Sequence, residues 1–290
     1  MKNQHILEIS LYPQKQRSKQ REELITQLIL TLAALVTIIP LLWILMGSLK
    51  NNNELFLNSF GIPHVWHFEN YYYAWKDGHI GADFFNSLFI CCVSIISILF
   101  ITSMAAYILS RFKFRINFTI YSFFLMGLMI PWASNLLPLF LTLKKIGVYD
   151  TYWALILPYI SFEIPFGVFI LTGFMKSIPT ELEEAAIIDG CSNWSIFLKV
   201  IIPLSKPVLS TVAILTFLDV WNEYLFALVF LSNPDHFTLS LGLASFQTGK
   251  VQHYGIIMAG IIISIIPVLI IYTLLQKQVI KGMTAGAVKG

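Results

Sequence analysis

Long runs of apolar residues, separated by short polar segments, recur along most of the chain. A helix needs about 20 apolar residues to cross the hydrocarbon core of a bilayer. Six stretches meet this length, at residues 24–46, 86–109, 118–143, 152–174, 208–231 and 256–275. The pattern therefore predicts an all-α membrane protein with six transmembrane helices, and six crossings put both termini on the same side of the membrane.

The composition supports the membrane class and narrows the chemistry. Hydrophobic residues make up 57% of the chain and charged residues 12%, whereas average soluble domains contain roughly 25% charged residues. The lysines and arginines are scattered and form no basic stripe of the kind that binds nucleic acid. The three cysteines show neither a disulfide framework nor metal-ligand spacing. No phosphate-binding loop or catalytic grouping is evident, so we expect no metal site, no nucleic-acid binding and no enzymatic residues.

The distribution of basic residues predicts which side the termini face. Cytoplasmic segments of membrane proteins carry an excess of lysine and arginine. With both termini in the cytoplasm, most of the 19 basic residues fall on the cytoplasmic side. The outside segments then hold only Lys50, Lys76, Lys144, Lys145 and Lys250. This orientation also places the polar segment between the fourth and fifth spans in the cytoplasm.

That polar segment, residues 179–203, is called the elbow below, and its first half predicts a short helix. Glu181, Glu183 and Glu184 lie where negative charge stabilises a helix N-terminus. Thr180 and Glu183 have the spacing of a capping box, in which each side chain bonds a backbone N–H near the other. The sequence therefore predicts a helix that begins at about residue 180.

The second half of the elbow predicts a turn and another short helix. Gly190 lies where a residue with positive φ can end the first helix, and Ser192 can cap the second, which Pro203 ends. Ala185 and Ala186 leave a patch of low relief on the first helix, which suits the groove of another protein. The elbow is predicted to be two short helices joined by a tight turn.

The elbow also carries a motif. Glu184-Ala185-Ala186 is followed, after three intervening residues, by Gly190. Nine further residues separate Gly190 from Val200, and one residue separates Val200 from Ile202-Pro203. This resembles the EAA loop of bacterial ABC importer permeases, E-A-A-x3-G-x9-I-x-L-P, with Val200 for Ile and Ile202 for Leu. The resemblance implies a type I ABC importer permease fold with a cytoplasmic coupling helix that docks into a separate ATPase. The coupling residues that it implies are Glu183, Glu184, Ala185, Ala186, Asp189, Gly190 and Pro203.

The C-terminal residues 282–290, Gly-Met-Thr-Ala-Gly-Ala-Val-Lys-Gly, resemble the tail of the carbohydrate-importing branch of this family, similar to maltose-system G subunits. The resemblance covers about residues 83–290. It implies a bacterial cell-membrane protein with a permease domain at 83–276 and a cytoplasmic tail at 277–290. The apolar spans and basic residues predict the earlier parts, which are a cytoplasmic tail at 1–23, a first transmembrane helix at 24–46 and an extracellular segment at 47–82. The implied partners are a second permease, an ABC ATPase dimer that uses ATP and Mg, an extracellular solute-binding protein, membrane lipid and a carbohydrate.

Several polar side chains fall inside the predicted spans. Glu163 lies in the fourth span, and Asp219, Trp221, Asn222 and Glu223 lie in the fifth. Ionisable groups at this depth face protein or water, and a spacing of four puts Asp219 and Glu223 on one helix face. Two interpretations remain open. These residues line a translocation route, where Trp221 or Tyr224 stacks on an apolar face of the ligand, or they form an interhelical network that closes the seam with a partner permease.

Two further features bear on mechanism. Pro131 and Pro138 in the third span predict a bent helix that borders a cavity. An aromatic cluster before the second span predicts an interfacial helix or a docking contact: Trp66, Phe68, Tyr71, Tyr72, Tyr73 and Trp75.

The alternative function is a proton-coupled secondary transporter that uses Glu163, Asp219 or Glu223, but the elbow would then have no partner.

Overall fold

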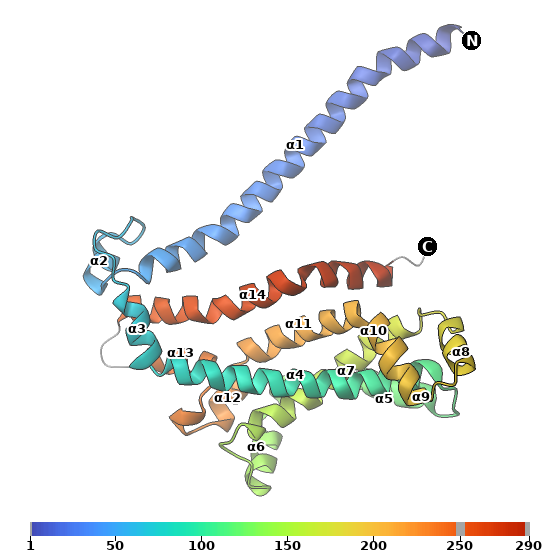
Figure 1. Ribbon diagram of the computed structural model, residues 1–290. Coiled ribbons are helices and arrows are strands. Elements are labelled where there is room, and N and C mark those ends of the chain that lie inside the picture. The colour runs from blue at the N-terminus through green and yellow to red at the C-terminus, as the bar shows by residue number, and fades with distance from the viewer. Residues whose placement is uncertain (1, 248–252, 288–290) are drawn as a thin grey trace. The chain divides into compact units, whose positions relative to one another are not determined.

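The computed structural model describes the backbone of residues 2–247 and 253–287 and the side chains of residues 23–246 and 253–276. In these ranges all regular structure is helical and no strand occurs, so the predicted all-α class is confirmed (Figure 1). The helices are α1 (Lys2–Gly47), α2 (Asn52–Leu57), α3 (Glu69–Lys76), α4 (Ile80–Arg111), α5 (Asn117–Gly127), α6 (Leu136–Lys145), α7 (Trp153–Met175), α8 (Glu181–Ile188), α9 (Asn193–Ile196), α10 (Ile202–Leu204), α11 (Lys206–Asn222), α12 (Leu225–Phe230), α13 (Leu239–Gln247) and α14 (Tyr254–Ala287). Short 3-10 turns occupy Trp132–Asn135 and Pro234–His236, and a π-helical turn occupies Phe197–Ile201.

Four helices of the described chain are long and apolar enough to cross a membrane by themselves, at 23–47, 80–111, 153–175 and 254–276. The count rises to six when each of two bent pairs is taken as one span. One pair is α5 with the 132–145 segment, bent by 90°, and the other is the 193–204 segment with α11, bent by 74°. The first pair is the broken counterpart of the predicted span 118–143. The second pair begins inside the elbow, so the predicted span 208–231 corresponds to α11 followed by α12 and not to this pair.

Two span boundaries differ from the prediction for physical reasons. The second span begins at Ile80 and not at residue 86, because the Asp83 carboxylate is buried against Gly242 and does not end the helix. The fifth span, predicted at 208–231, breaks after Asn222, where Glu223 adopts an extended backbone conformation before α12. No proline or glycine marks this break in the sequence.

The chain forms two compact units, Met1–Asn70 with His253–Ala259, and Tyr71–Gln252 with Gly260–Gly290. In the smaller unit the segment after α1 is fixed by buried polar contacts. Trp43 Nε1 donates to the carbonyl of Ser59 at 2.9 Å. Lys50 is fully buried, and its Nζ donates to the carbonyls of Asn58 and Gly61, each at 2.6 Å.

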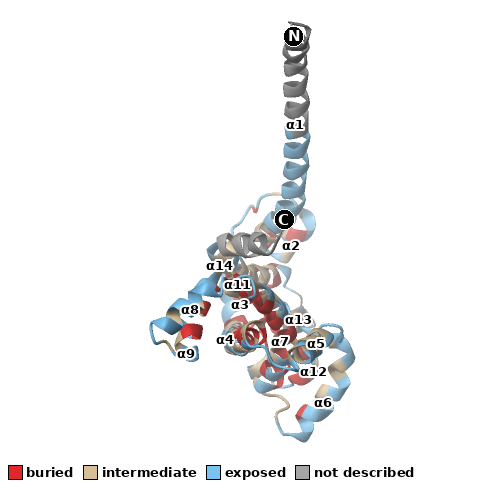
Figure 2. Ribbon diagram, turned by 90° about the vertical axis from the view of Figure 1, so that its right-hand side faces the viewer, coloured by how far each residue is buried: buried red, intermediate tan, exposed pale blue. Residues whose placement is uncertain are grey.

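The larger unit is built on α4 and α7, which lie side by side and form its most extensive helix contact (Figure 1). Buried residues gather on these two helices (Figure 2). A glycine allows the close approach, because a Cβ at Gly167 would lie 2.6 Å from Cγ2 of Thr102 on α4. Small residues at such contacts let membrane helices pack backbone to backbone. This pair positions both of the sites described next.

Candidate functional site

The first helix of the elbow is α8, but it does not begin with the predicted capping box. Thr180 has helical backbone angles and its side chain makes no capping hydrogen bond. The Glu183 side chain turns away from the helix end and forms an ion pair with Nε of Arg111, the last residue of α4. The capping-box prediction is therefore wrong, because a partner distant in sequence competes for Glu183.

The turn and the second half of the elbow follow the prediction. Gly190 has φ of +81° and ends the first helix, as a residue without Cβ can at low cost. Ser192 Oγ accepts the N–H of Ser195 at 3.3 Å and caps α9. The helical path then widens into the π turn and ends at Leu204, one residue after Pro203.

The second half of the elbow is embedded in the core of the larger unit. Its residues Ile196, Phe197 and Ile201 are buried in one cluster with residues of three long helices. The members from those helices are Ala106 and Tyr107 of α4, Leu171 and Met175 of α7, and Val208 and Val212 of α11. A displacement of the elbow would therefore be transmitted to α4, α7 and α11 together.

The first half of the elbow is mostly exposed, and Figure 2 shows α8 at the edge of the unit. Leu182 is 45% exposed, Ile187 57% and Ile188 86%. Ala185 is exposed, and Ala186 is half-buried because it also packs against the core cluster. An exposed apolar group of this kind is a common mark of a surface that binds another protein. Glu184 and Asp189 border it and are also exposed.

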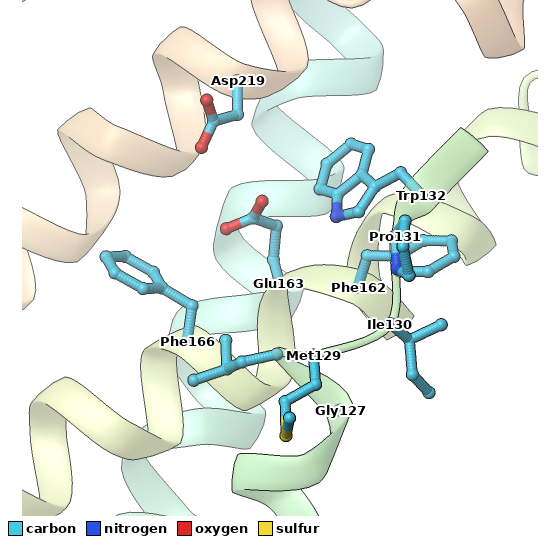
Figure 3. Close-up of a pocket in the computed structure, with 10 residues that line it drawn as sticks. Gly127, Met129, Ile130, Pro131, Trp132, Phe162, Glu163, Phe166 and Asp219 are labelled. Atoms are coloured by element: carbon cyan, nitrogen blue, oxygen red, sulfur yellow. The ribbon is translucent and has the colours of Figure 1, made fainter. Parts of the chain in front are cut away.

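A second site is a cavity of about 600 Å³ between α5, α7 and α11. One wall is the non-helical break from Gly127 to Trp132, and Figure 3 shows the carboxylates of Glu163 and Asp219 directed into the space from α7 and α11. The remaining walls are the rings of Phe162 and Phe166. The prediction that the proline-bent third span borders a cavity is confirmed.

The two carboxylates differ in their surroundings. Glu163 is 4% exposed, and one of its oxygens accepts a hydrogen bond from the Thr216 hydroxyl at 3.2 Å. Asp219 is exposed. The cavity thus presents one buried and one accessible acceptor to anything that enters it.

The cavity also has an aromatic wall that the sequence did not single out. Trp132 stacks on Phe162 and Phe226 with centroid distances of 5.2 and 5.9 Å, and the two phenyl centroids are 5.8 Å apart. These three distances form a nearly equilateral triangle, so the phenyl rings do not lie on opposite faces of the indole. Trp132 also lines the cavity. The position of Trp132 directly after Pro131 was the signal available in the sequence.

Three other candidates lie outside this cavity. Trp221 is 3% exposed, packs on Phe217 and Phe84, and donates its Nε1–H to the carbonyl of Ser264 at 3.1 Å. Its predicted role of stacking on a ligand is therefore wrong, because both its ring and its polar atom are already used. Asn222 bonds the carbonyl of Leu218 in its own helix.

Glu223 is also occupied. Its carboxylate accepts from the Tyr159 hydroxyl at 2.6 Å and from the backbone N–H groups of Phe226 and Ala227, which begin α12. Since α11 ends at Asn222, Glu223 does not share a helix face with Asp219, and that prediction is wrong. The contacts of Glu223 are all within this chain and join α7 to the start of α12.

The elbow and the cavity can now be set beside known proteins. The family described as binding-protein-dependent transport system inner membrane component matches residues 97–285, which is more than half of the chain. The chain belongs to this family. The matched region of this permease contains both the elbow and the cavity, and the resemblance predicted from the elbow motif is confirmed.

The curated relatives of this permease match over most of its length. The probable ABC transporter permease protein YurM of Bacillus subtilis is 39% identical over 251 residues, covering 87% of this chain and 83% of the relative. The diacetylchitobiose uptake system permease protein NgcG of Streptomyces coelicolor is 35% identical, covering 93% and 90%. The trehalose/maltose transport system permease protein MalG of Thermococcus litoralis is 35% identical, covering 93% and 99%.

Solved structures agree on the fold of this permease. A chain of a bacterial ABC transporter involved in the import of the acidic polysaccharide alginate superposes with a TM-score of 0.78 at 24% identity, covering 90% of this chain and 97% of that one. A chain of the MetNI methionine ABC transporter gives a TM-score of 0.53 at 19% identity, covering 68% and 93%. The predicted importer permease fold is confirmed.

Proposed function

We propose that this permease is a subunit of an ATP-driven importer that moves an oligosaccharide into the cytoplasm. The observation that carries the proposal is the division of the elbow into an exposed apolar helix and a second half buried in the core. In this proposal a cytoplasmic ABC ATPase dimer binds α8 and uses ATP and Mg. A second permease completes the pathway, and an extracellular solute-binding protein delivers the sugar.

The coupling step follows from how the elbow is attached. An ATPase groove that takes up Leu182, Ile187 and Ile188 would bury apolar surface now exposed to water. Closure of the ATPase dimer would then displace α8, and the buried second half would pass that displacement to α4, α7 and α11. The excess of basic residues on the elbow side supports its cytoplasmic placement.

The cavity supports a sugar as cargo. Carboxylates accept hydrogen bonds from hydroxyl groups, and an aromatic face suits the apolar face of a sugar ring, as Trp132 offers here. The names of NgcG and MalG also refer to sugars. Because Glu163 and Asp219 are both acidic, the site favours neutral or amino sugars over uronic acids, unlike the cargo named for the alginate importer.

The same two carboxylates favour a second candidate, a proton-coupled transporter in which Glu163 or Asp219 carries the proton. The experiment that separates the two uses proteoliposomes that contain the permease co-purified with its native partners. We expect sugar uptake to require hydrolysable ATP on the ATPase side and to persist in a protonophore. Uptake that a protonophore abolishes while ATP is ample would favour the second candidate, and uptake by this chain alone would exclude the first.

A further inference from the structure

Arg111 joins α4 to α8 and to the residue just before the elbow through one hydrogen bond and one ion pair. Its Nη2 donates to the carbonyl of Ile178, in the segment between α7 and α8, at 2.9 Å. Its Nε pairs with the carboxylate of Glu183 on α8 itself. A guanidinium can do both at once because its donors are fixed in a planar fork, which a lysine lacks. One side chain therefore ties the end of α4 to the segment just before the elbow and to α8.

The pair is shielded from water, which makes it more than a surface contact. The side chains of Arg111 and Glu183 are 9% and 12% exposed. Exposed ion pairs contribute little, but a charge that is buried and then loses its partner is strongly unfavourable. Arg111 is also at the C-terminal end of α4, where a positive charge is stabilised by the helix dipole.

α8 has few other attachments that would hold it. None of its eight residues is buried, and its inward contact with the core cluster is made by the small side chain of Ala186. Its leucine and isoleucines are 45–86% exposed and are not members of that cluster. Two side chains of α4 meet Glu183: Arg111 forms the ion pair, and Tyr107 shares a hydrogen bond with the carboxylate. Together these polar contacts hold the orientation of α8 against α4 in the described structure.

We propose that Arg111 is a positioning residue for energy coupling: it clamps α8 to α4 through Glu183, so that displacement of α8 by the ATPase moves the α4 and α7 pair. This inference rests on the proposed function. Without the clamp, the ATPase still binds the outer face of α8, but α8 tilts without moving α4. Some ATP is then hydrolysed without import of sugar.

The test compares three variants in the complete reconstituted complex. Glu183→Gln keeps the size of the side chain and removes its charge, Arg111→Gln removes the other partner, and Glu181→Gln is the control, because Glu181 is exposed in the first turn of the same helix. The measurement is ATP hydrolysed per sugar imported. We expect the ratio to rise at least about fivefold in Glu183→Gln and Arg111→Gln and to stay unchanged in Glu181→Gln.

The double variant Arg111→Gln/Glu183→Gln checks that the two residues act as a pair. A ratio equal to that of the more affected single variant supports the clamp, and effects that multiply would overturn it. A wild-type ratio in both single variants also overturns it. Wild-type complex that shows no ATP-driven uptake would instead contradict the proposed function.

A second measurement covers variants that lose activity through poor assembly. Amide hydrogen exchange of the isolated permease reports the local stability of α8 directly. We expect residues 181–188 to exchange at least about tenfold faster in Glu183→Gln, with α7 unchanged. Exchange in 181–188 at the wild-type rate would overturn the proposal whatever the activity data show.

Discussion

The two ends of the α4 and α7 pair hold their neighbouring segments in different ways. At the elbow end, α8 is held to α4 through one side chain, Glu183, which pairs with Arg111 and shares a hydrogen bond with Tyr107. At the opposite end, Asp150 Oδ1 accepts the backbone N–H groups of Ser232 and Asn233 at 2.7 and 3.0 Å. The first attachment can be lost by one substitution, whereas the second is spread over several bonds.

Asn86 reinforces this opposite end. Its Nδ2 donates to the carbonyls of Asp235 and Phe237 at 2.9 and 3.0 Å, and its Oδ1 accepts from the Tyr152 hydroxyl at 2.8 Å. The segment after α12 is thereby bonded to the starts of both α4 and α7. This permease therefore fixes the loop after α12 through several hydrogen bonds from Asp150 and Asn86. At the other end, α8 depends on the single side chain of Glu183.

The largest effect is expected from separating α4 and α7, since both ends depend on that pair. Gly167→Ile would drive a branched side chain into Thr102 and should destabilise the fold by about 1–3 kcal/mol. Gly173→Ala on the same helix is the control, because a Cβ there meets no atom within 4 Å. Thermal unfolding in detergent measures both, and equal stability of the two variants would contradict the packing argument.

A smaller effect, confined to the elbow end, is expected from Ile188→Glu. Ile188 is the most exposed apolar residue of α8, so a charge there leaves the fold intact and disrupts the proposed ATPase contact. We expect ATPase affinity to fall at least about tenfold, which is ~1.4 kcal/mol. Leu57→Glu, at a residue exposed to a similar degree in α2, is the control. Co-purification that survives Ile188→Glu would place the ATPase contact elsewhere.

The turn of the elbow provides a graded test of backbone geometry. Gly190 has open space around its Cβ position, so its requirement is positive φ alone. Gly190→Ala should cost about 1 kcal/mol and Gly190→Asn less, because asparagine adopts the left-handed conformation more readily. Sugar uptake and hydrogen exchange of the elbow should follow the order Gly, Asn, Ala. An asparagine variant worse than the alanine variant would contradict this reading.

The smallest effect is expected at the opposite end and depends on pH. Partial burial raises the pKa of Asp150, but the N–H groups of Asn233 and Ser232 and the nearby His236 outweigh it and hold the pKa below its usual range. The carboxylate therefore stabilises this end at neutral pH, and the contribution is lost as pH falls through the lowered pKa. Because the group is partly exposed, Asp150→Asn should cost only about 0.5 kcal/mol at pH 7. Unfolding measured from pH 7 to 3 should show the difference between the proteins shrink.

Much of this molecule follows from local sequence patterns. The apolar runs predicted the spans, and Gly190 and Ser192 predicted the end of one helix and the start of the next, because these depend on backbone geometry nearby. The failures involve distant partners. Glu183 has the spacing for a cap, but Arg111 takes its charge, and no local pattern reveals that competition.

The cavity shows the same limit. Glu163 and Asp219 were identified because carboxylates are conspicuous in an apolar span, and both line the cavity. Trp221 and Trp132 look alike in sequence, yet Trp221 is buried against Phe84 and Phe217 while Trp132 lines the cavity. Trp132 follows the break after α5, and the direction of a side chain after such a break depends on how the chain bends in the folded protein.

The buried ammonium of Lys50 gives the smaller unit a built-in chemical reporter. Its nitrogen is enclosed by the carbonyls of Asn58 and Gly61 and has no access to solvent. An amine-acylating reagent can therefore modify Lys50 only when the chain around it opens, while Lys76 and Lys145 react at once because they are exposed. The rate of acylation at this one nitrogen would report how often the smaller unit opens locally.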